Sequence, residues 1–174
     1  DVADVPGAKT LWQIAGGATL DSKTPVTLRW DNGKGLIFTR TIAVDDKFMF
    51  TITDAVENAS ATAVSLAPYG IIARHGLPKL ENIYVVHEGV IRRTDGNLEE
   101  PNYKDLPDLD DFEGVKGQKI DATENGWIGF TDHYWMTTLI PEQGKPWTAV
   151  EKYTPGADIY QTEVRQPLVT VAPG

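Results

Sequence analysis

The sequence contains no cysteine among its 174 residues. This absence excludes disulfide bonds, thiol catalysis and cysteine-ligated zinc, although it does not decide the compartment. The sequence also lacks any run approaching the roughly 18 apolar residues of a membrane-spanning helix, and no signal-peptide pattern begins it. It starts at Asp1 rather than at a methionine. We therefore expect a segment excised from a longer protein.

Basic residues are in the minority, since 16 Lys and Arg face 25 Asp and Glu, for a net charge of -9. Binding to a phosphate backbone calls for a basic patch, so we predict no nucleic-acid partner. The same acidic balance disfavours docking on anionic lipid headgroups through bulk charge. The length suits one domain over residues 1–174, with a core that needs no cross-links.

Most of the sequence reads as short strands rich in Ile, Val, Phe and Thr, separated by turn residues. This pattern predicts an all-β sandwich. The clearest hairpin joins residues 36–44 to residues 48–53 through a polar loop at residues 45–47. A second turn is the dipeptide Asp95-Gly96, which is typical of tight hairpins.

Two further local signals qualify the strand pattern. Gly89 stands alone between the predicted strands at residues 84–88 and 90–93, which indicates a bulge or a sharp bend. No long window has a period of 3.6 residues, so helices are short or absent. The best helical candidate is a turn or two over residues 103–109.

Two segments are expected to be irregular. Residues 1–23 are rich in Gly and Ala. Residues 98–115 are strongly acidic and could form a calcium loop, an acidic docking site or a solvated connection. We favour the solvated connection, because calcium loops need ordered oxygen spacing and a glycine at a sharp turn, which this segment lacks.

Residues 126–141 combine two tryptophans with Phe130 and Tyr134 and contain no Lys, Arg or Glu. They predict a hairpin that is either a buried part of the core or the floor of an aromatic site. We predict that Trp127, Phe130, Tyr134 and Trp135 are mostly buried.

The sequence offers few candidate catalytic residues. The three histidines, His75, His87 and His133, lack the spacing that would place two imidazoles on one face, so we predict no metal site. The neighbours His87-Glu88 and Asp132-His133 invite an acid–base interpretation. Adjacent strand residues point to opposite faces, however, so we expect neither pair to act as a unit.

Four blocks of the sequence occur in the order found in a known family. They are residues 35–54, the tripeptides Pro68-Tyr69-Gly70 and Arg74-His75-Gly76 taken together, residues 86–91, and residues 126–141. The blocks span most of residues 12–170. With these blocks the sequence resembles the large periplasmic domain of YidC, the bacterial membrane protein insertase.

This resemblance implies a β-super-sandwich related in shape to galactose mutarotase, truncated here at both ends. It implies a location at the periplasmic face of the bacterial inner membrane, within a multi-pass membrane protein. It also implies partners, namely the Sec translocon and its accessory proteins SecD and SecF, and contact with the membrane only through the transmembrane segments of the parent protein. Insertase activity resides in the membrane helices of the family, so we expect no catalytic residue and no cofactor in this chain.

Two functions from different classes remain open. The first is a non-catalytic periplasmic domain that supports membrane protein insertion, which we favour on the resemblance. The alternative is a carbohydrate-binding or aldose-epimerase-like protein of mutarotase shape. An epimerase needs a histidine and a carboxylate that face each other across an open cleft. The candidate ligand-binding residues are His75, Glu88, Asp132, His133 and Trp135.

Overall fold

The structure, a computed structural model, describes residues 4–77 and 87–174. Strands make up most of these residues, and their one helical element is the short 3-10 helix η1 (Tyr103–Asp108). Both the all-β prediction and the predicted helical turn over residues 103–109 are confirmed. The predicted strand at residues 84–88 falls largely on residues 78–86, which lie outside the described residues.

The chain divides into two compact units. Unit 1 comprises Asp1–Leu66 and Val169–Gly174, and unit 2 comprises Ala67–Leu168. The single domain over residues 1–174 stays a prediction. Each unit is described by itself below.

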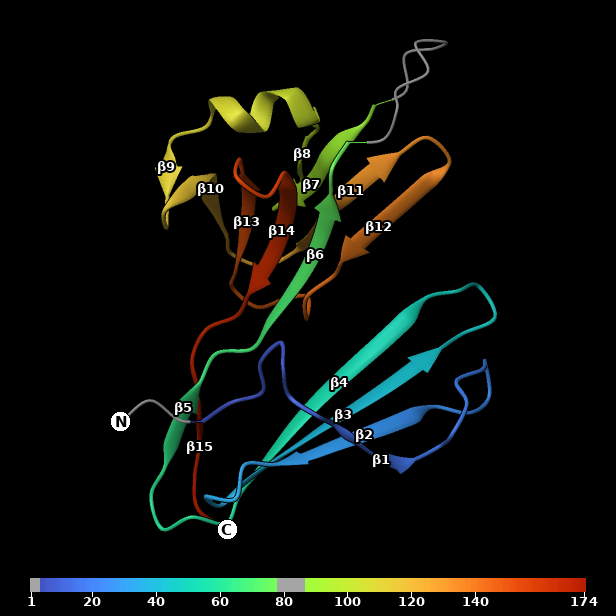
Figure 1. Ribbon diagram of the computed structural model, residues 1–174, viewed down its shortest axis with the longest axis vertical. Coiled ribbons are helices and arrows are strands. Elements are labelled where there is room, and N and C mark those ends of the chain that lie inside the picture. Colours follow the sequence, from blue (N-terminus) through green and yellow to red (C-terminus); the bar gives the residue numbers. More distant parts are fainter. Residues whose placement is uncertain (1–3, 78–86) are drawn as a thin grey trace. The chain divides into compact units, whose positions relative to one another are not determined.

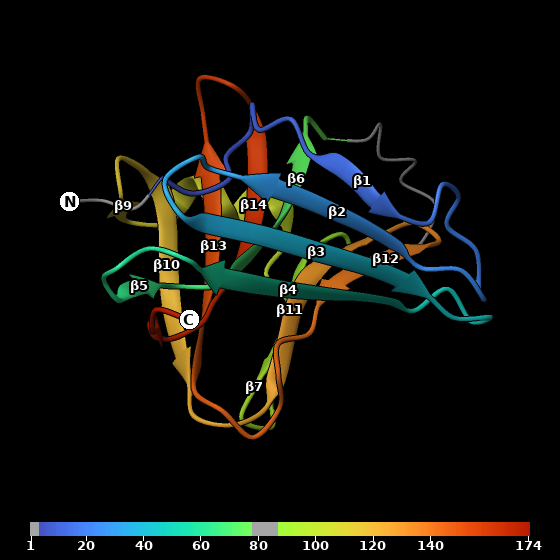
Figure 2. The same cartoon turned by 90° about the horizontal axis from the view of Figure 1, so that it is seen from below.

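Unit 1 is built on one antiparallel sheet in the order β1-β2-β3-β4, which Figure 2 shows side by side. Its strands are β1 (Gln13–Gly16), β2 (Val26–Asp31), β3 (Leu36–Val44) and β4 (Phe50–Asn58), and a separate ladder pairs β5 (Val64–Leu66) with β15 (Val169–Val171). Ile42 stands opposite Val26 and Ile52, whereas Thr41 stands opposite Thr27 and Thr53. Because successive side chains point to opposite faces, the sheet has an apolar face and a polar face.

The predicted hairpin between β3 and β4 is present, but its second strand begins two residues later than expected. Asp45 Oδ1 accepts hydrogen bonds from the backbone N–H groups of Lys47 and Met49, at 2.8 and 2.9 Å. These bonds keep the chain in a turn as far as Met49. Strand β4 therefore starts at Phe50.

Unit 2 consists of two antiparallel sheets (Figure 1). One has the order β6-β14-β13-β10-β9 and the other the order β12-β11-β7-β8. The strands of the first sheet are β6 (Tyr69–His75), β14 (Ile159–Arg165), β13 (Trp147–Thr154), β10 (Val115–Ala122) and β9 (Asp111–Phe112). Those of the second sheet are β12 (Trp135–Leu139), β11 (Gly126–Asp132), β7 (Gly89–Thr94) and β8 (Asn97–Glu99).

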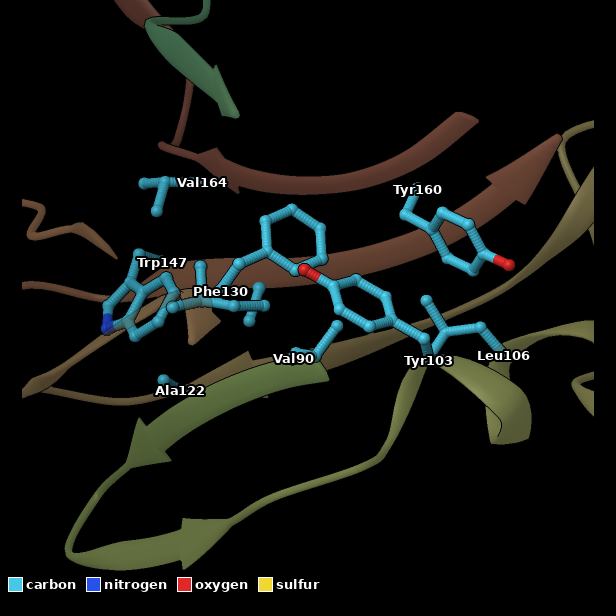
Figure 3. Packing of buried hydrophobic residues seen from close by; sticks show 10 residues of the cluster. Val90, Tyr103, Leu106, Ala122, Phe130, Trp147, Tyr160 and Val164 are labelled. Atoms are coloured by element: carbon cyan, nitrogen blue, oxygen red, sulfur yellow. The ribbon is translucent and has the colours of Figure 1, made fainter. Parts of the chain in front are cut away.

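The core of unit 2 lies between these two sheets and is closed by η1 (Figure 3). Tyr103 of η1 packs its ring 5.6 Å from that of Phe130 on β11 and 5.0 Å from that of Tyr160 on β14. The other members of the buried cluster are Val90, Leu106, Ala122, Ile128, Trp147, Ala149 and Val164. Both sheets contribute side chains to one apolar layer, which makes unit 2 a sandwich.

Gly89 occupies the bend that the sequence predicts. It begins β7 with a φ of 154°, and a Cβ atom built on it would lie 2.3 Å from the carbonyl oxygen of Pro101. A side chain at this position would collide with backbone, so the close approach requires glycine.

The two segments expected to be irregular contain some regular structure. Strand β1 lies within residues 1–23, and the acidic residues 98–115 contain both η1 and β9. Within the acidic segment Tyr103 and Leu106 are buried, while Glu113 accepts hydrogen bonds from Lys152 at 2.6 Å and Arg165 at 2.7 Å. The acidic segment therefore packs on the strands of unit 2 through apolar anchors and ion pairs.

Candidate functional site

A hollow of about 300 Å³ opens in unit 2 beside the edge strands β6 and β12. Strand β6 contributes four consecutive residues to its wall, and the remaining side chains come from β11 and β12. The lining residues are Ile72, Ala73, Arg74, His75, Phe130, Asp132, Trp135 and Thr137. The lining of the hollow thus combines apolar and aromatic side chains with charged and polar groups.

The polar side of the hollow is organised around Asp132. Its Oδ2 accepts a hydrogen bond from Nη1 of Arg74 in an ion pair, and its Oδ1 accepts a hydrogen bond from the Tyr103 hydroxyl at 3.0 Å. The guanidinium of Arg74 also lies 5.9 Å from the centre of the Tyr103 ring. Both carboxylate oxygens of Asp132 are therefore engaged inside the protein.

Burial, together with the negative charge of Asp132, raises the pKa of Tyr103 far above its ordinary value. The phenol consequently keeps its proton at every physiological pH and acts as a permanent donor to Asp132. The Arg74 guanidinium and the Tyr103 phenol thus anchor the Asp132 side chain through one hydrogen bond to each carboxylate oxygen.

The structure brings together three of the five candidate residues. His75, Asp132 and Trp135 line the hollow, although they lie up to 60 positions apart in the sequence. His75 is an exposed residue at the end of β6. Trp135 opens β12 and leaves 77% of its surface exposed at the rim.

The other candidates lie outside this lining. The backbone carbonyl of Glu88 accepts a hydrogen bond from the N–H of Tyr103 at 3.3 Å, which places Glu88 beside η1. His133 is exposed on the β11–β12 turn. Its ring and that of Tyr134 meet edge-to-face, with 4.0 Å between the ring centroids. His87 makes a 2.6 Å hydrogen bond through Nδ1 to Oγ1 of Thr131. The neighbours Asp132 and His133 do not act as a pair, because their side chains have separate partners.

The prediction that four aromatic residues of this segment are mostly buried is partly wrong. Phe130 is buried in the core and Trp127 is half-buried, but Tyr134 and Trp135 are 89% and 77% exposed. Strand β12 is the edge of its sheet, and the register pairs Asp132 with Trp135 across a turn formed by His133 and Tyr134. The turn and the start of β12 therefore project from the sandwich, whereas Leu139 at the end of β12 packs against the core.

Arg74 and Tyr103 are site residues that the sequence did not single out. Arg74 lies 58 positions from Asp132, and Tyr103 lies 29 positions from it. No spacing rule links such distant residues, because the pairing of β6 with β14 and the docking of η1 bring them together. The one signal available was local, since Tyr103 begins the predicted helical turn.

Two negative findings apply to the part of the chain that the structure describes. Within residues 4–77 and 87–174, no group of three or more His, Asp or Glu side chains is arranged to hold a metal ion. In the same ranges, no helix has the length and apolar character needed to cross a membrane.

The chain matches one family along its whole length. The family described as YidC periplasmic domain covers residues 1–174. Among proteins named membrane protein insertase YidC, the one from Cereibacter sphaeroides is 60% identical over 174 residues, covering 98% of this chain and 28% of the relative. The relative from Paracoccus denitrificans is 56% identical and that from Jannaschia sp. is 55% identical, each over 175 residues and 28% of its length.

These matches confirm the resemblance found in the sequence. The chain spans 28% of the length of the relatives described above, so it aligns with only one region of these longer proteins. The four sequence blocks named earlier all lie inside the matched region. The chain belongs to the YidC periplasmic domain family.

Proposed function

We propose that this chain is a non-catalytic periplasmic domain of a membrane protein insertase. In this role it lies at the periplasmic face of the bacterial inner membrane, as part of a multi-pass membrane protein. It supports inner-membrane protein insertion and folding through contacts with the Sec translocon and its accessory proteins SecD and SecF.

The observation that carries this proposal is the family match over all 174 residues, together with 60% identity to a relative named membrane protein insertase YidC. Such identity along 98% of the chain supports a shared role for the region. The association with SecD and SecF rests on the family resemblance.

The geometry of the hollow supports a non-catalytic role. A general base needs a free lone pair within reach of the proton that it removes. Asp132 has Arg74 on one oxygen and the Tyr103 hydroxyl on the other, so both oxygens already make hydrogen bonds that link β6, β11 and η1. The arrangement suits a binding or structural surface better than proton transfer.

A co-purification experiment tests the proposed partners. The intact parent insertase and a variant that lacks residues 1–174 are purified from solubilised membranes and probed for SecD and SecF. We expect both partners with the intact protein and at least about tenfold less of each with the deletion. Equal recovery of both partners from the two samples would refute the proposed contact.

The alternative function is tested on the same residues. His75 and Asp132 line one hollow with an exposed tryptophan, which is a geometry that an aldose epimerase or sugar binder could use. Aldose mutarotation is measured for the chain and for its His75→Ala and Asp132→Asn variants. We expect no turnover with any of them. Turnover that falls by about 10²–10⁴-fold in either variant would establish the enzyme and overturn our proposal.

A further inference from the structure

The tip of the β11–β12 hairpin is unusually apolar for a solvent-exposed turn. We call the residues His133, Tyr134, Trp135 and Met136 the aromatic tip. Tyr134, Trp135 and Met136 are 89%, 77% and 53% exposed, whereas Trp147 is buried and Trp12, Trp30 and Trp127 are each half-buried. Trp135 is therefore the tryptophan that unit 2 offers to an external partner.

Hydrogen bonds to Asp132, at the base of the turn, hold the tip in one conformation. Asp132, which closes the turn against Trp135, is anchored by Arg74 and by the Tyr103 hydroxyl. Tyr134 has a φ of 70°, a conformation that bulky residues rarely adopt. The rings of His133 and Tyr134 meet edge-to-face, with 4.0 Å between their centroids. The aromatic rings are thus presented to solvent by a preorganised turn, which lowers the entropic cost of binding.

The tip also lies in a stretch without carboxylate, Lys or Arg side chains, in an otherwise acidic chain. Residues 133–141 contain no Asp, Glu, Lys or Arg, while the whole chain has a net charge of -9. The adjacent carboxylate of Asp132 is paired with Arg74. An apolar phase can therefore accept the tip without the desolvation of an unpaired charge.

We propose that the aromatic tip seats in the interfacial layer of a lipid bilayer. Tyr and Trp combine an apolar ring with one polar group, and they concentrate at the boundary between headgroups and acyl chains. The surface area of the tip favours this partner over a protein. Two aromatic side chains bury roughly 300–500 Å², which is well below the roughly 800 Å² per partner of a stable protein interface.

This inference rests on the proposed function for its setting, since a periplasmic domain of a membrane protein lies close to a bilayer. Its test does not depend on Sec partners. The chain is mixed with vesicles of pure phosphatidylcholine, and the bound fraction is measured by sedimentation. We expect binding with a blue shift of tryptophan fluorescence and with quenching by brominated lipid. Phosphatidylglycerol should not increase the binding, because the tip contains no Lys or Arg.

The decisive variant is Tyr134→Ser/Trp135→Ser. We expect its partition coefficient to fall at least about tenfold, because two interfacial anchors are removed. Leu98→Ser is the matched control, since Leu98 is 55% exposed on β8 at the opposite edge of the same sheet. The control should bind like the wild type. Trp135→Phe should keep most of the binding and lose most of the blue shift.

Three outcomes would overturn the lipid inference. The first is that the wild type does not bind vesicles, and the second is that the double variant binds as well as the control when circular dichroism shows both to be folded. The third is that a photocrosslinker at position 135 of the intact insertase captures a protein and no lipid. Loss of SecD and SecF from the co-purification would leave the vesicle result unchanged, so the two proposals fail separately.

Discussion

Arg92 of β7 donates a hydrogen bond from Nη1 to Oε2 of Glu151 on β13 at 2.8 Å, with both side chains buried between the two sheets of unit 2. Gln118 of β10 donates to the other oxygen of Glu151, and Glu99 of β8 pairs with Nη2 of Arg92. Burial raises the pKa of Glu151 above its ordinary value, while the Arg92 cation opposes this shift. The pair therefore links the two sheets at a place where one charge without the other would be costly.

We expect Arg92→Met to lower the free energy of unfolding by roughly 3–5 kcal/mol, because it leaves the Glu151 carboxylate buried without its cation. The double variant Arg92→Met/Glu151→Leu should recover most of this loss. Losing the cation raises the pKa of Glu151 further, so the loss should be largest at neutral pH and shrink as acid protonates the carboxyl.

Urea unfolding measures these variants, and the exposed ion pair between Arg29 and Asp31 provides the control. Its nitrogen–oxygen distance is 3.6 Å and both side chains are at least 40% exposed. Arg29→Met should cost less than about 1 kcal/mol. A similar cost for Arg92→Met would show that the buried pair contributes little.

Trp135→Ala should change the free energy of unfolding by less than about 0.5 kcal/mol, because the ring is exposed on an edge strand. Trp147→Ala should cost roughly 3–5 kcal/mol, because that ring lies in the core. Chemical unfolding of both variants under one set of conditions compares the two sites. Equal losses would mean that the two tryptophans have similar environments.

Acid should lower the stability that Asp95 gives to the loop at residues 123–125. The N–H groups of Thr123, Glu124 and Asn125 donate to its carboxylate at 2.7, 3.0 and 3.3 Å, and these bonds lower the pKa of Asp95 to about 2. A lowered pKa contributes stability above the unfolded-state value near 3.8, and this stability is lost as the pH falls toward 2.

Asp95→Asn should therefore unfold at a lower urea concentration than the wild type at pH 7, and the difference should narrow between pH 4 and about pH 2. Asp46→Asn, on the exposed β3–β4 turn, is the matched control and should follow the wild type at each pH. A constant difference between Asp95→Asn and the wild type across this range would contradict the assigned role.

Gly129 on β11 lies opposite Thr138 on β12. A Cβ atom built on it would lie 1.9 Å from the carbonyl oxygen of Thr137. We expect Gly129→Ala to cost about 3 kcal/mol or more, since backbone must move to accommodate it. Gly156 has open space around its Cβ position, so Gly156→Ala should stay within about 1 kcal/mol of the wild type. Thermal unfolding of the two variants gives the comparison.

Local features of the structure could be predicted from the sequence because their physical causes lie within a few residues. The Asp95-Gly96 turn is an example, since both residues have positive φ angles and close the tight hairpin between β7 and β8. The helical turn at Tyr103 also follows from nearby residues, and the isolated Gly89 marks a bend although the backbone that it approaches belongs to the distant Pro101. The family could be recognised for a similar reason, since its blocks are contiguous stretches of sequence.

The candidate site and the exposure of the aromatic residues depended on tertiary structure. The alternation of apolar and polar residues along a strand shows which side chains share a face. It does not show whether the strand lies at the edge or at the centre of its sheet. Trp135 is exposed at the turn end of the edge strand β12, whereas Phe130 on the central strand β11 is buried in the cluster between the two sheets. The sequence determined the strands and turns of this protein. Sheet order decided that Arg74 meets Asp132 across 58 positions, since long-range strand pairing alone brings such distant residues together.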